Sequence, residues 1–419
     1  MQALGQLMST TCKRERLVIV GNGMAAARLC AELAAQTPQR YDITVLGAEP
    51  EAAYNRVLLS SVLAGELNED ALCLRAQDFY AAHDIKVHSS AKVVGLDPAG
   101  HNVTLADGRA FAFDKLVLAT GSQPLMPPLP GMGLQGVMAF RDLADTRRLQ
   151  ALGARHADVV VIGGGLLGLE AAAGLVRRGA KVRLLHLMDR LMERQLDRAG
   201  AAHLRRAMER RGVVVELGAS TAKILGENHV SGVALADGRS FAAEAVVWAI
   251  GIKPEIAVAR GAGLEIGRGI KVDDQMRTSD ADIYALGECA EHRAQVYGLV
   301  EPAYAQAATL ANHLSGGIAS YEGSVLATHL KIAGVGIFSC GDVQGAPGTS
   351  SAVLEDAASG IYRKVVTDGD RLVGAVLVGD TDDAGFYRDL VTQGTPIGVF
   401  GADLVFGPQF LGSPSQVAA

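Results

Sequence analysis

The sequence predicts an α/β fold with two Rossmann-like domains and a small C-terminal α+β domain. A strand, a glycine turn, a helix and a second strand follow one another near the N-terminus, and the same series returns about 140 residues later. Each series is typical of a βαβ unit in a parallel sheet. The 419 residues suffice for two to four domains at roughly 100 to 200 residues each. The 50 glycines exceed the usual share without a collagen-like period, so we expect them to serve backbone geometry.

The two βαβ units have matching elements. The first has a strand at 17–20, a glycine turn, a helix at 24–35 and a strand at 42–46. The second has a strand at 158–162, a turn at 163–165, a helix at 166–178 and a strand at 181–186. A hairpin at 106–109 returns at 236–239, and an apolar strand at 115–119 returns at 245–250. We therefore expect an internal duplication of a whole domain.

The rest of the chain supplies shorter elements. We expect a helical stretch at 78–83, a buried strand at 283–286 and a helix at 302–314. For the last part we expect short strands at 328–332, 336–338, 362–366 and 372–378 and a helix at 383–393. The expected domains are a flexible leader at 1–14, a first, discontinuous Rossmann-like domain at 15–118 with 245–325, a second at 119–244, an α+β domain at 326–410 and a tail at 411–419.

Composition excludes several classes of protein. The net charge of −6 and the pI near 5.9 provide no basic field for nucleic acid. The five cysteines lie far apart with no CxxC pair, so we expect no zinc or iron–sulfur site and no metal, and a reducing, cytoplasmic setting. The longest uncharged run, 116–140, carries four prolines, and the N-terminus lacks the charge order of a signal peptide. We expect no membrane-spanning segment.

The first glycine turn has the pattern G-x-G-x-x-A, from Gly21 to Ala26. Its position between a strand and a helix brings backbone and a helix N-terminus to a pyrophosphate. Glu49 lies just past the second strand, where a carboxylate accepts hydrogen bonds from a ribose. The alternative is a tight turn without a ligand.

The second glycine turn, Gly163 to Gly168, has the full pattern G-x-G-x-x-G after a buried strand. A second adenine dinucleotide is the simplest explanation, and two such sites imply transfer between two nucleotides. The second strand of this unit ends at His186, so no acid stands at the expected ribose position. Arg190 favours NADPH if it reaches a 2′-phosphate, and the alternative is an ordinary solvated arginine.

The order of motifs resembles a known family. Those motifs are GNGMAAA, AYNRVLLSSVLAGE, LATGSQP, VIGGGLLGLEAA, LMERQLD, WAIGIKP, TSDADIYALGECAE and GAVLVGDT. They resemble the FAD and NAD module of NADH-dependent assimilatory nitrite reductase and of the electron-transfer subunit of assimilatory nitrate reductase. Both belong to the two-dinucleotide flavoprotein family, glutathione-reductase-like in fold, that also holds rubredoxin and ferredoxin reductases. The resemblance runs from about residue 16 to 380, and the stretches at 54–56, 191–197 and 287–289 are its more specific parts.

This resemblance implies FAD on the first turn and NADH, or NADPH, on the second. The residues implied for FAD are Gly21, Gly23, Met24, Ala26, Glu49, Lys92, Val93, Ala119, Thr120, Gly121, Gly287, Glu288, Val300 and Glu301. Those implied for the nicotinamide nucleotide or the space between the two rings are Arg56, Arg141, Gly163, Gly165, Leu166, Leu167, Gly168, Glu170, His186, Arg190 and Gly251. Glu288 stands where the family usually has Asp, and its alternative role is to close a strand.

Arg56 and Glu170 are the candidate catalytic residues. Arg56 matches a position where relatives carry a lysine beside the flavin, and a cation there stabilises negative charge on a reduced ring. Its alternative role is packing. Glu170 matches a place near the stacked rings, although an acid in the first turns also suits the helix dipole. Val300 and Glu301 precede the expected helix at 302–314, whose N-terminus faces the flavin in the family.

The absence of a cysteine pair after the first βαβ unit excludes a thiol relay. We expect Cys73 to be a small buried residue and Cys289 to pack beside the FAD. The sequence has no cysteine-rich segment and no sirohaem half, so we expect nitrite reduction to occur in another chain. Four arginines at 205, 206, 210 and 211 either dock an acidic iron–sulfur partner or form a solvated face.

The predicted function is therefore that of an FAD-dependent NAD(P)H reductase without a redox-active disulfide. Electrons pass from NADH through FAD to a separate iron-containing protein, a nitrate or nitrite reductase chain by resemblance. A rubredoxin or ferredoxin reductase is the alternative enzyme, and a redox sensor that binds FAD and NADH is the alternative of another class. The sequence favours NADH slightly, by resemblance alone, and leaves the oligomeric state and the role of the C-terminal domain open.

Overall fold

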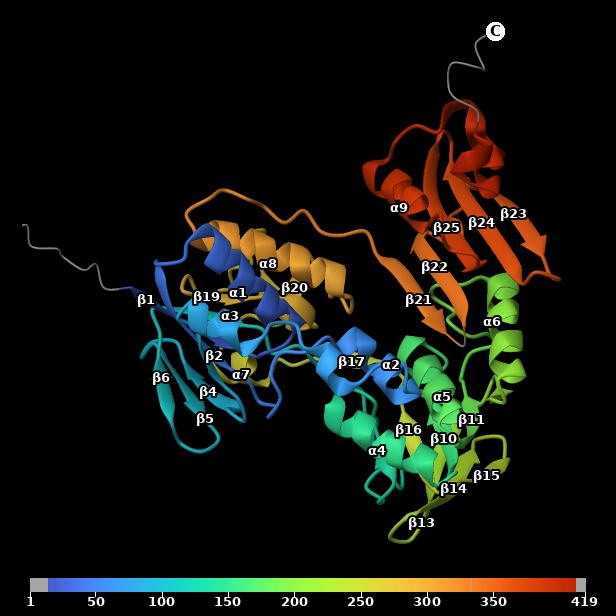
Figure 1. Cartoon of the computed structure of the whole chain (residues 1–419), viewed down its shortest axis with the longest axis horizontal. Helices are drawn as coiled ribbons and strands as arrows, with labels where there is room; N and C mark the ends of the chain where they lie inside the picture. The colour runs from blue at the N-terminus through green and yellow to red at the C-terminus, as the bar shows by residue number, and fades with distance from the viewer. Residues whose placement is uncertain (1–13, 333, 412–419) are drawn as a thin grey trace, which may run out of the picture. The chain divides into compact units, whose positions relative to one another are not determined.

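The computed structural model describes residues 14–332 and 334–411 of the chain (Figure 1). The expected leader and tail, with Cys12, fall almost wholly outside the described residues. Two compact units divide the chain. Unit 1 comprises residues 1–55, 72–123 and 253–323, and unit 2 comprises 56–71, 124–252 and 324–419. The short strands β8 (Ser122–Pro124) and β17 (Ile252–Pro254) pair where the chain passes from one unit to the other.

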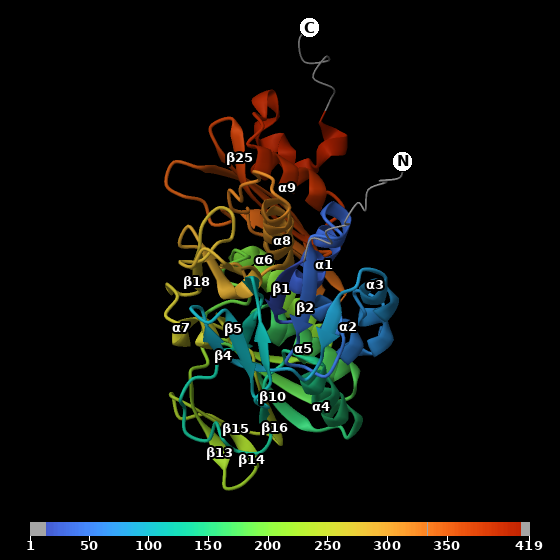
Figure 2. The same cartoon turned by 90° about the vertical axis from the view of Figure 1, so that its left-hand side faces the viewer.

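A parallel sheet of order β19-β7-β1-β2-β3 forms the centre of unit 1. Its strands are β1 (Glu15–Val20), β2 (Tyr41–Leu46), β3 (Lys86–His88), β7 (Lys115–Leu118) and β19 (Ile283–Ala285). Helices α1 (Met24–Gln36) and α8 (Val300–Leu314) lie side by side in both views and bury one face of the sheet (Figures 1 and 2). Alternate residues of β1 therefore enter different cores, with Leu17 and Ile19 beneath the helices and Val18 and Val20 in the opposite core.

The opposite core of unit 1 is closed by short elements. The antiparallel strands β4 (Val93–Asp97), β5 (Asn102–Leu105) and β6 (Ala110–Ala112) contribute Val93, Val103 and Leu105 to it. The remaining elements are α3 (Gln77–Ala82), α7 (Ala257–Gly261), β18 (Ile270–Val272), the 3₁₀ turn η3 (Gly287–Cys289) and β20 (Ala290–His292).

The central sheet of unit 2 has the equivalent strand order. It runs β12-β11-β10-β16-β9, all parallel, beside the antiparallel strands β13, β14 and β15. The strands are β9 (Val137–Met138), β10 (Asp158–Ile162), β11 (Lys181–Leu185), β12 (Val214–Glu216), β13 (Thr221–Gly226), β14 (Val230–Leu235), β15 (Ser240–Ala242) and β16 (Ala245–Trp248). The helical elements are η1 (Arg56–Leu58), α2 (Leu59–Ala64), η2 (Glu69–Leu72), α4 (Leu143–Ala154), α5 (Leu166–Arg177) and α6 (Arg198–Arg210).

The two predicted hairpins confirm the duplication at the level of single hydrogen bonds. In both turns the arginine N–H donates to the aspartate two residues earlier at 3.0 Å, and the arginine Nε donates to the same carboxylate at 2.8 Å. The pairs are Asp107 with Arg109 and Asp237 with Arg239, and Gly108 and Gly238 take positive φ between them. Such Asp-Gly turns supply the left-handed residue that a tight hairpin needs.

The C-terminal part of unit 2 is a five-stranded antiparallel sheet with helices. Its order is β21-β22-β25-β24-β23, and Tyr362, Val365, Ala375 and Leu377 are buried in it. The elements are β21 (Ala327–Ile332), β22 (Val335–Gly341), β23 (Ser350–Asp356), β24 (Ile361–Asp368), β25 (Arg371–Gly379), α9 (Ala384–Gln393), η4 (Gly398–Phe406) and η5 (Pro408–Phe410).

Three expectations about elements were wrong or incomplete. The helix expected from residue 302 begins at Val300, so Val300 and Glu301 belong to its first turn. Helix α4 and strand β23 were not predicted, because α4 is polar overall and β23 alternates between exposed and half-buried residues. In the described residues, no helix is long and apolar enough to cross a membrane.

Candidate functional site: two glycine turns and a pocket

The first glycine turn requires glycine where the chain passes closest to strand β7. Gly21 has φ +111°, and a Cβ there would lie 2.1 Å from the carbonyl oxygen of Ala119. Gly23 is the N-cap of α1, makes no side-chain cap, and has nothing within 4 Å of its Cβ position. Met24 begins the helix, and Ala26 is fully buried. An uncapped helix N-terminus with open space in front of it suits an anionic phosphate.

The second glycine turn repeats this geometry. Gly163 has φ +124°, and a Cβ there would lie 2.2 Å from the carbonyl oxygen of Ala249. Gly165 is the N-cap of α5, again without a side-chain cap and with nothing within 4 Å of its Cβ position. Leu166 and Leu167 form the first helical residues. A Cβ on Gly168 would lie 1.9 Å from the Gly163 carbonyl oxygen, so the helix and the turn touch there.

Two buried amide groups near the first turn were missed from the sequence. Asn22 Nδ2 and Gln306 Nε2 are buried and have no hydrogen-bond partner within the described residues. The side-chain Oε1 of Gln306 accepts from the Gly287 N–H at 2.7 Å, and Gly287 lies against Ala25. Unpaired buried donors are costly, so their presence fits a bound group that accepts hydrogen bonds. The position of Asn22 between the two glycines was the signal that could have identified it.

The residues expected around the adenosine end of FAD lie at one edge of the unit 1 sheet. Glu49 accepts a hydrogen bond from the Tyr54 hydroxyl at 2.6 Å, and its carbonyl accepts from the Ser90 N–H at 3.0 Å. Lys92 and Val93 follow at the start of β4. The structure therefore brings Glu49 to the segment that leads into Lys92 and Val93.

A second group of predicted residues gathers where β7 ends. The Glu288 carboxylate accepts from the Ser122 hydroxyl at 2.7 Å, and the Thr120 hydroxyl donates to the Glu255 carbonyl at 2.7 Å. Gly121 and Gly287 take positive φ, at +68° and +79°. Glu288 thus lies beside the segment Ala119–Gly121, with Val300 and Glu301 at the start of α8.

Cys289 is buried, whereas the expectation that Cys73 is buried was wrong. The Cys289 Sγ is buried and lies 3.3 Å from the carbonyl oxygens of Leu118 and Leu286, and burial raises the pKa of its thiol. Cys73 is exposed rather than buried, with its Sγ 3.2 Å from the Arg75 carbonyl. The described cysteines are all free, and no cluster of three or more metal-ligating side chains occurs in residues 14–332 and 334–411.

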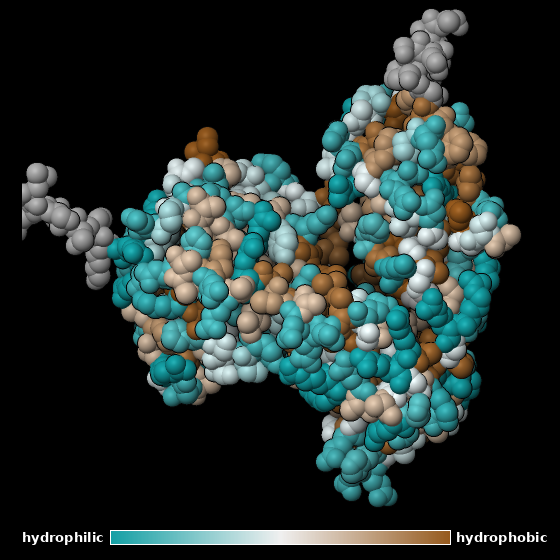
Figure 3. Space-filling view, viewed as in Figure 1, coloured by the Kyte–Doolittle hydropathy of each residue, from teal (hydrophilic) through white to brown (hydrophobic). Residues whose placement is uncertain are grey.

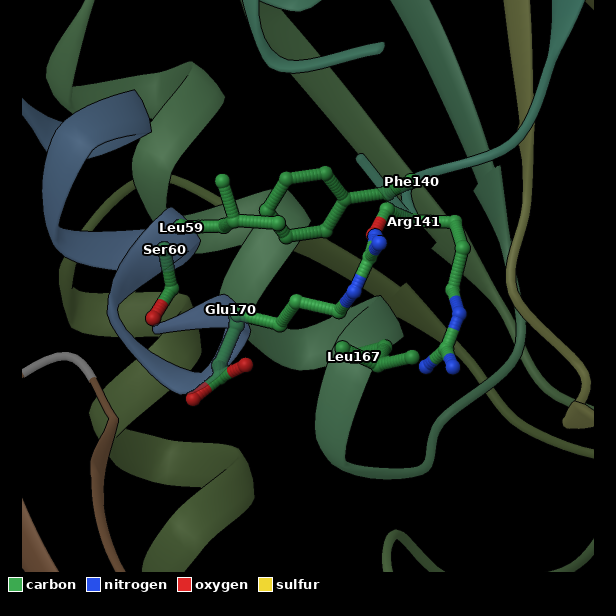
Figure 4. A pocket seen from close by; sticks show the side chains of 7 residues that line it. Leu59, Ser60, Phe140, Arg141, Leu167 and Glu170 are labelled. Carbon is green, nitrogen blue, oxygen red and sulfur yellow. The ribbon is translucent and has the colours of Figure 1, made fainter. Parts of the chain in front are cut away.

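In unit 2, the two candidate catalytic residues line one pocket. Its lining is Arg56, Leu59, Ser60, Phe140, Arg141, Leu167 and Glu170 (Figure 4). Arg56 Nη1 donates to the Arg141 carbonyl at 3.2 Å. Figure 4 shows the Ser60 hydroxyl and the Glu170 carboxylate on one side of the pocket and Arg141 beside Leu167 on the other. Burial raises the pKa of Glu170 to about 7, and a hydrogen bond from Ser60 offsets part of that rise.

The pocket exists because α2 packs closely on α5. A Cβ on Gly174 would lie 2.8 Å from the Leu63 Cγ, so glycine makes room for that side chain. Arg178 at the end of α5 donates to the carbonyls of Leu63 and Val62 at 2.7 and 3.2 Å. These contacts satisfy carbonyls at the end of α2 and fix Ser60 on the same short helix.

His186 and Arg190 make their contacts within the protein. His186 is buried; its Nδ1 accepts from the Gly164 N–H at 3.0 Å, and its Nε2 lies 3.1 Å from the Glu193 carboxylate. The Arg190 guanidinium lies 3.1 Å from Asp189 Oδ1 and donates to the carbonyls of Glu193 and Leu196 at 3.3 and 3.4 Å. Gly251 follows β16 with φ +127° and accepts from the Leu125 N–H at 2.9 Å.

The four arginines considered as a docking face lie on α6 and just after it. Arg205 pairs with Glu209 at 2.7 Å, while Arg206, Arg210 and Arg211 are exposed. Figure 3 shows hydrophilic surface along the edge of the molecule that α6 occupies.

Comparison with known proteins identifies related chains. Residues 15–308 match the model described as pyridine nucleotide-disulphide oxidoreductase, and residues 327–395 match the rubredoxin NAD+ reductase C-terminal domain. The chain is 42% identical to a Bacillus subtilis nitrite reductase [NAD(P)H] over 88% of this chain and 46% of that one. It is 38% identical to the Bacillus subtilis assimilatory nitrate reductase electron transfer subunit over 96% of this chain and 53% of that one.

The fold comparison agrees with these matches. A ferredoxin reductase from Rhodopseudomonas palustris superposes with a TM-score of 0.86 at 25% identity, over 97% of this chain and the whole of that one. The chain spans about half the length of the two Bacillus relatives.

Proposed function

Because this chain belongs to the pyridine nucleotide-disulphide oxidoreductase family, we propose that it is an FAD-dependent NAD(P)H reductase that passes electrons to a separate protein. The observation that carries the proposal is the pair of equivalent glycine turns. Each turn ends at an uncapped helix N-terminus with open space before it. Two such turns in one chain suit two adenine dinucleotides and transfer between them.

The first turn would hold FAD. Gly21 and Gly23 allow backbone to approach the pyrophosphate, and the orphaned amide of Asn22 supplies a buried donor beside it. Glu49 would accept from the adenosine ribose, and Glu288 from the ribityl chain. When bound, FAD supplies the chemistry of accepting a hydride from a nicotinamide and releasing electrons singly.

The second turn would hold the nicotinamide nucleotide, and NADH is favoured over NADPH. Arg190 is the candidate reader of a 2′-phosphate, but its guanidinium is occupied by Asp189 and two backbone carbonyls of its own loop. A cation held in this way would have to break those contacts to reach a phosphate. Gly163, Gly165 and Gly168 then shape a site whose pyrophosphate is bound by backbone N–H groups.

Arg56 and Glu170 would act on charge and protons in the pocket that they share. Arg56 provides a permanent cation for negative charge that develops on the acceptor ring. Glu170 holds or releases a proton at its carboxyl oxygen near neutral pH, because burial has raised its pKa to about 7. The proposal involves no redox-active disulfide, and the four described cysteines are all free.

The acceptor we propose is a nitrate or nitrite reductase chain in the cytoplasm. The two Bacillus relatives named above favour it. A rubredoxin or ferredoxin acceptor is the second candidate, favoured by the match of residues 327–395 to the rubredoxin reductase C-terminal domain. In this proposal the FAD domain comprises residues 15–118 and 245–325, and the NAD(P)H domain comprises residues 119–244.

Anaerobic mixing with NADH tests the proposal. The purified protein should be yellow, and its flavin absorbance should bleach within the stopped-flow time range. Addition of oxidised rubredoxin, ferredoxin or nitrate reductase chain to separate samples should then restore the colour for the true acceptor. A protein that binds flavin but keeps its colour with both NADH and NADPH would contradict the reductase and favour a redox sensor.

The role of Arg56 is tested in the same assay. We expect Arg56→Met to slow flavin reduction roughly tenfold, which corresponds to about 1.4 kcal/mol of lost stabilisation. Arg56→Lys should recover most of the rate because it keeps the charge. Equal rates for the wild type and Arg56→Met would remove Arg56 from the mechanism.

A further inference from the structure

The loop between β11 and α6, residues 186–197, rests directly on the second glycine turn. Both backbone polar groups of Gly164 are bound by this loop: its N–H donates to His186 Nδ1, and its carbonyl accepts from the Met192 N–H, each at 3.0 Å. A Cβ on Gly164 would lie 2.6 Å from the His186 ring and 2.9 Å from Leu191. The position of the glycine turn therefore depends on the position of the loop, which we call the nucleotide loop.

The far end of the nucleotide loop is held by the C-terminal sheet. Asp197 is the N-cap of α6, and its Oδ1 accepts from the Gly200 N–H at 3.0 Å. Its Oδ2 accepts from the Tyr362 hydroxyl at 2.6 Å and lies 3.5 Å from Lys364 Nζ. Tyr362 and Lys364 stand on β24 and are only 1% and 9% exposed. One carboxylate thus caps the helix, ends the loop and joins the C-terminal sheet.

Further contacts join α6 and the nucleotide loop to the C-terminal sheet. The Tyr362 ring lies over the first turn of α6, 3.4 Å from where a Cβ of Gly200 would be, and its centroid is 5.9 Å from that of His203. His203 Nε2 lies 2.8 Å from the Glu355 carboxylate on β23. Gln344 donates to the carbonyls of Glu193 and Leu196 at 3.4 and 3.3 Å, which are the same two carbonyls that Arg190 binds.

The Tyr362 hydroxyl is suited to a fixed donor role. Burial and the adjacent Asp197 carboxylate both raise the pKa of Tyr362 far above its ordinary value. The hydroxyl therefore stays protonated and acts as a donor at neutral pH. A charged acceptor makes this one of the stronger hydrogen bonds of unit 2.

We propose that the C-terminal domain sets the nucleotide affinity of the second glycine turn through Tyr362 and Asp197. Tyr362 is a positioning residue: it fixes Asp197, Asp197 fixes the end of the nucleotide loop, and the loop fixes Gly164. The identity of the nucleotide as NADH rests on the proposed function, whereas the coupling between Tyr362 and the glycine turn does not.

The test compares two buried tyrosines of the same domain. Tyr362→Phe removes the hydroxyl that reaches Asp197 and keeps the ring. Tyr387→Phe is the matched control, because Tyr387 is also fully buried and its hydroxyl donates to the Leu404 carbonyl at 2.6 Å inside the domain. Stopped-flow reduction of the bound flavin at varied NADH gives the Kd and the limiting rate separately.

We expect Tyr362→Phe to raise the Kd for NADH by roughly three- to tenfold, which is less than the full worth of a hydrogen bond to a charged group because the effect reaches Gly164 only through the loop. The limiting rate and the flavin content should be unchanged, because the loop contains the expected ribose position at His186 and contributes no residue to the pocket of Arg56 and Glu170. Tyr387→Phe should leave all three quantities unchanged. An unchanged Kd in Tyr362→Phe would overturn the proposal, and so would an equal rise in both variants, since that would indicate general softening of the domain.

Calorimetric titration with ADP-ribose separates this inference from the proposed function. ADP-ribose cannot reduce flavin, so its Kd reports the glycine turn even if NADH fails to bleach the wild type. The same selective loss in Tyr362→Phe would then support the coupling while the reductase fails, and absence of ADP-ribose binding in the wild type would overturn it. If Tyr362→Phe does not fold, Asp197→Asn, which keeps an N-cap acceptor but removes the charge, should raise the Kd in the same direction, and no rise would overturn the proposal.

Discussion

In unit 1 the side chain of Asn22 stands over Gly47, whereas in unit 2 the ring of His186 stands over Gly164. Gly47 and His186 are equivalent, because each follows the leucine whose carbonyl accepts from the first glycine of the turn. A Cβ on Gly47 would lie 2.8 Å from the Asn22 Cβ, and one on Gly164 would lie 2.6 Å from the His186 ring. One side chain fills this space in each unit, but it comes from the turn in unit 1 and from the strand in unit 2.

This exchange changes what each turn offers to a ligand. In unit 1 the Asn22 side chain places a buried amide N–H beside Gly21 and Gly23. In unit 2 the His186 imidazole is instead occupied by its contacts with Gly164 and Glu193. Counted from the same strand ends, Glu49 of unit 1 corresponds to Met188 of unit 2, which is 43% exposed. The duplicated backbone therefore supports two different ligand chemistries, and the difference resides in a few side chains.

Replacing the first glycine of each turn should have the largest effect, and the effect should fall on a different ligand in each unit. A Cβ at either position meets a backbone carbonyl at 2.1 or 2.2 Å, in a conformation that disfavours other residues. We expect Gly21→Val to lose the flavin, and Gly163→Val to keep it but to bind NADH roughly tenfold more weakly or worse. Flavin absorbance per protein and the NADH Kd provide the two readouts.

Gly385→Ala is the control for these two variants, since nothing lies within 4 Å of its Cβ position. The assignment of the two turns would be reversed if Gly163→Val were colourless and Gly21→Val kept its flavin.

The last residue of each turn motif, Ala26 in unit 1 and Gly168 in unit 2, should give a smaller difference, measured as the free energy of unfolding. Gly168→Ala places a Cβ 1.9 Å from the Gly163 carbonyl, so α5 must move, and we expect a cost of about 2 kcal/mol in the free energy of unfolding. Ala26→Gly should cost about 1 kcal/mol through helix propensity and about 0.8 kcal/mol through the lost methyl group, because Ala26 is fully buried. Trp248, the single tryptophan, belongs to unit 2, so its fluorescence should follow Gly168→Ala and be indifferent to Ala26→Gly. The same shift in both variants would mean that the units do not unfold separately.

Glu170 should make the stability of unit 2 depend on pH, whereas the residue at the matching position of unit 1 should not. Its folded pKa of about 7 lies above the ordinary glutamate value of 4.5, so its contribution to stability is complete below about pH 4.5 and is lost as the pH rises through 7. We expect Glu170→Gln to be more stable than the wild type at pH 8, by on the order of 2 kcal/mol, and similar to it at pH 4.5. Urea unfolding followed at Trp248 measures this.

The counterpart of Glu170 in α1 is Arg28, which pairs with Glu32 at 2.6 Å. Arg28→Gln should therefore leave the pH profile unchanged. A flat difference between wild type and Glu170→Gln from pH 4.5 to 8 would show that folding does not raise the pKa of Glu170.

The smallest effect is expected for Arg190. Because its guanidinium is bound within the nucleotide loop, Arg190→Ala should change the ratio of kcat/KM for NADH to that for NADPH by less than about threefold. A selective loss of NADPH activity greater than this would mean that Arg190 leaves the loop to bind a 2′-phosphate.

The local pattern of residues was enough to predict most of the fold. The strands β1, β10 and β16 each contain a continuous apolar run shortly before a glycine, and the two Asp-Gly-Arg hairpins have the same turn chemistry in both units. Strand β23 escaped prediction because it is exposed on the sheet edge, and the exposure of Cys73 depends on packing that its neighbours in sequence do not reveal.

The glycine turns could be identified as ligand sites because their spacing is local. The hydrogen bonds that join Gly164 to His186, Gly287 to the Gln306 side chain and Tyr362 to Asp197 connect residues 22, 19 and 165 positions apart in the chain. Such pairs leave no periodic pattern in the sequence, so only the folded structure reveals them. The site residues expected around FAD and NADH stay predictions until a ligand is bound.

The discontinuity of unit 1 reverses the order in which the chain can fold during synthesis. Domains generally fold from the N-terminus as they leave the ribosome. Strand β1 begins at Glu15, yet its sheet ends with β19 at Ile283–Ala285 and its helical layer with α8 at Val300–Leu314. The parallel sheet of unit 2 has its last strand at Ala245–Trp248 and can close first. The nascent chain must therefore keep Leu17 and Ile19 from aggregating while the later domain forms, which makes β1 the segment that a chaperone would need to shield.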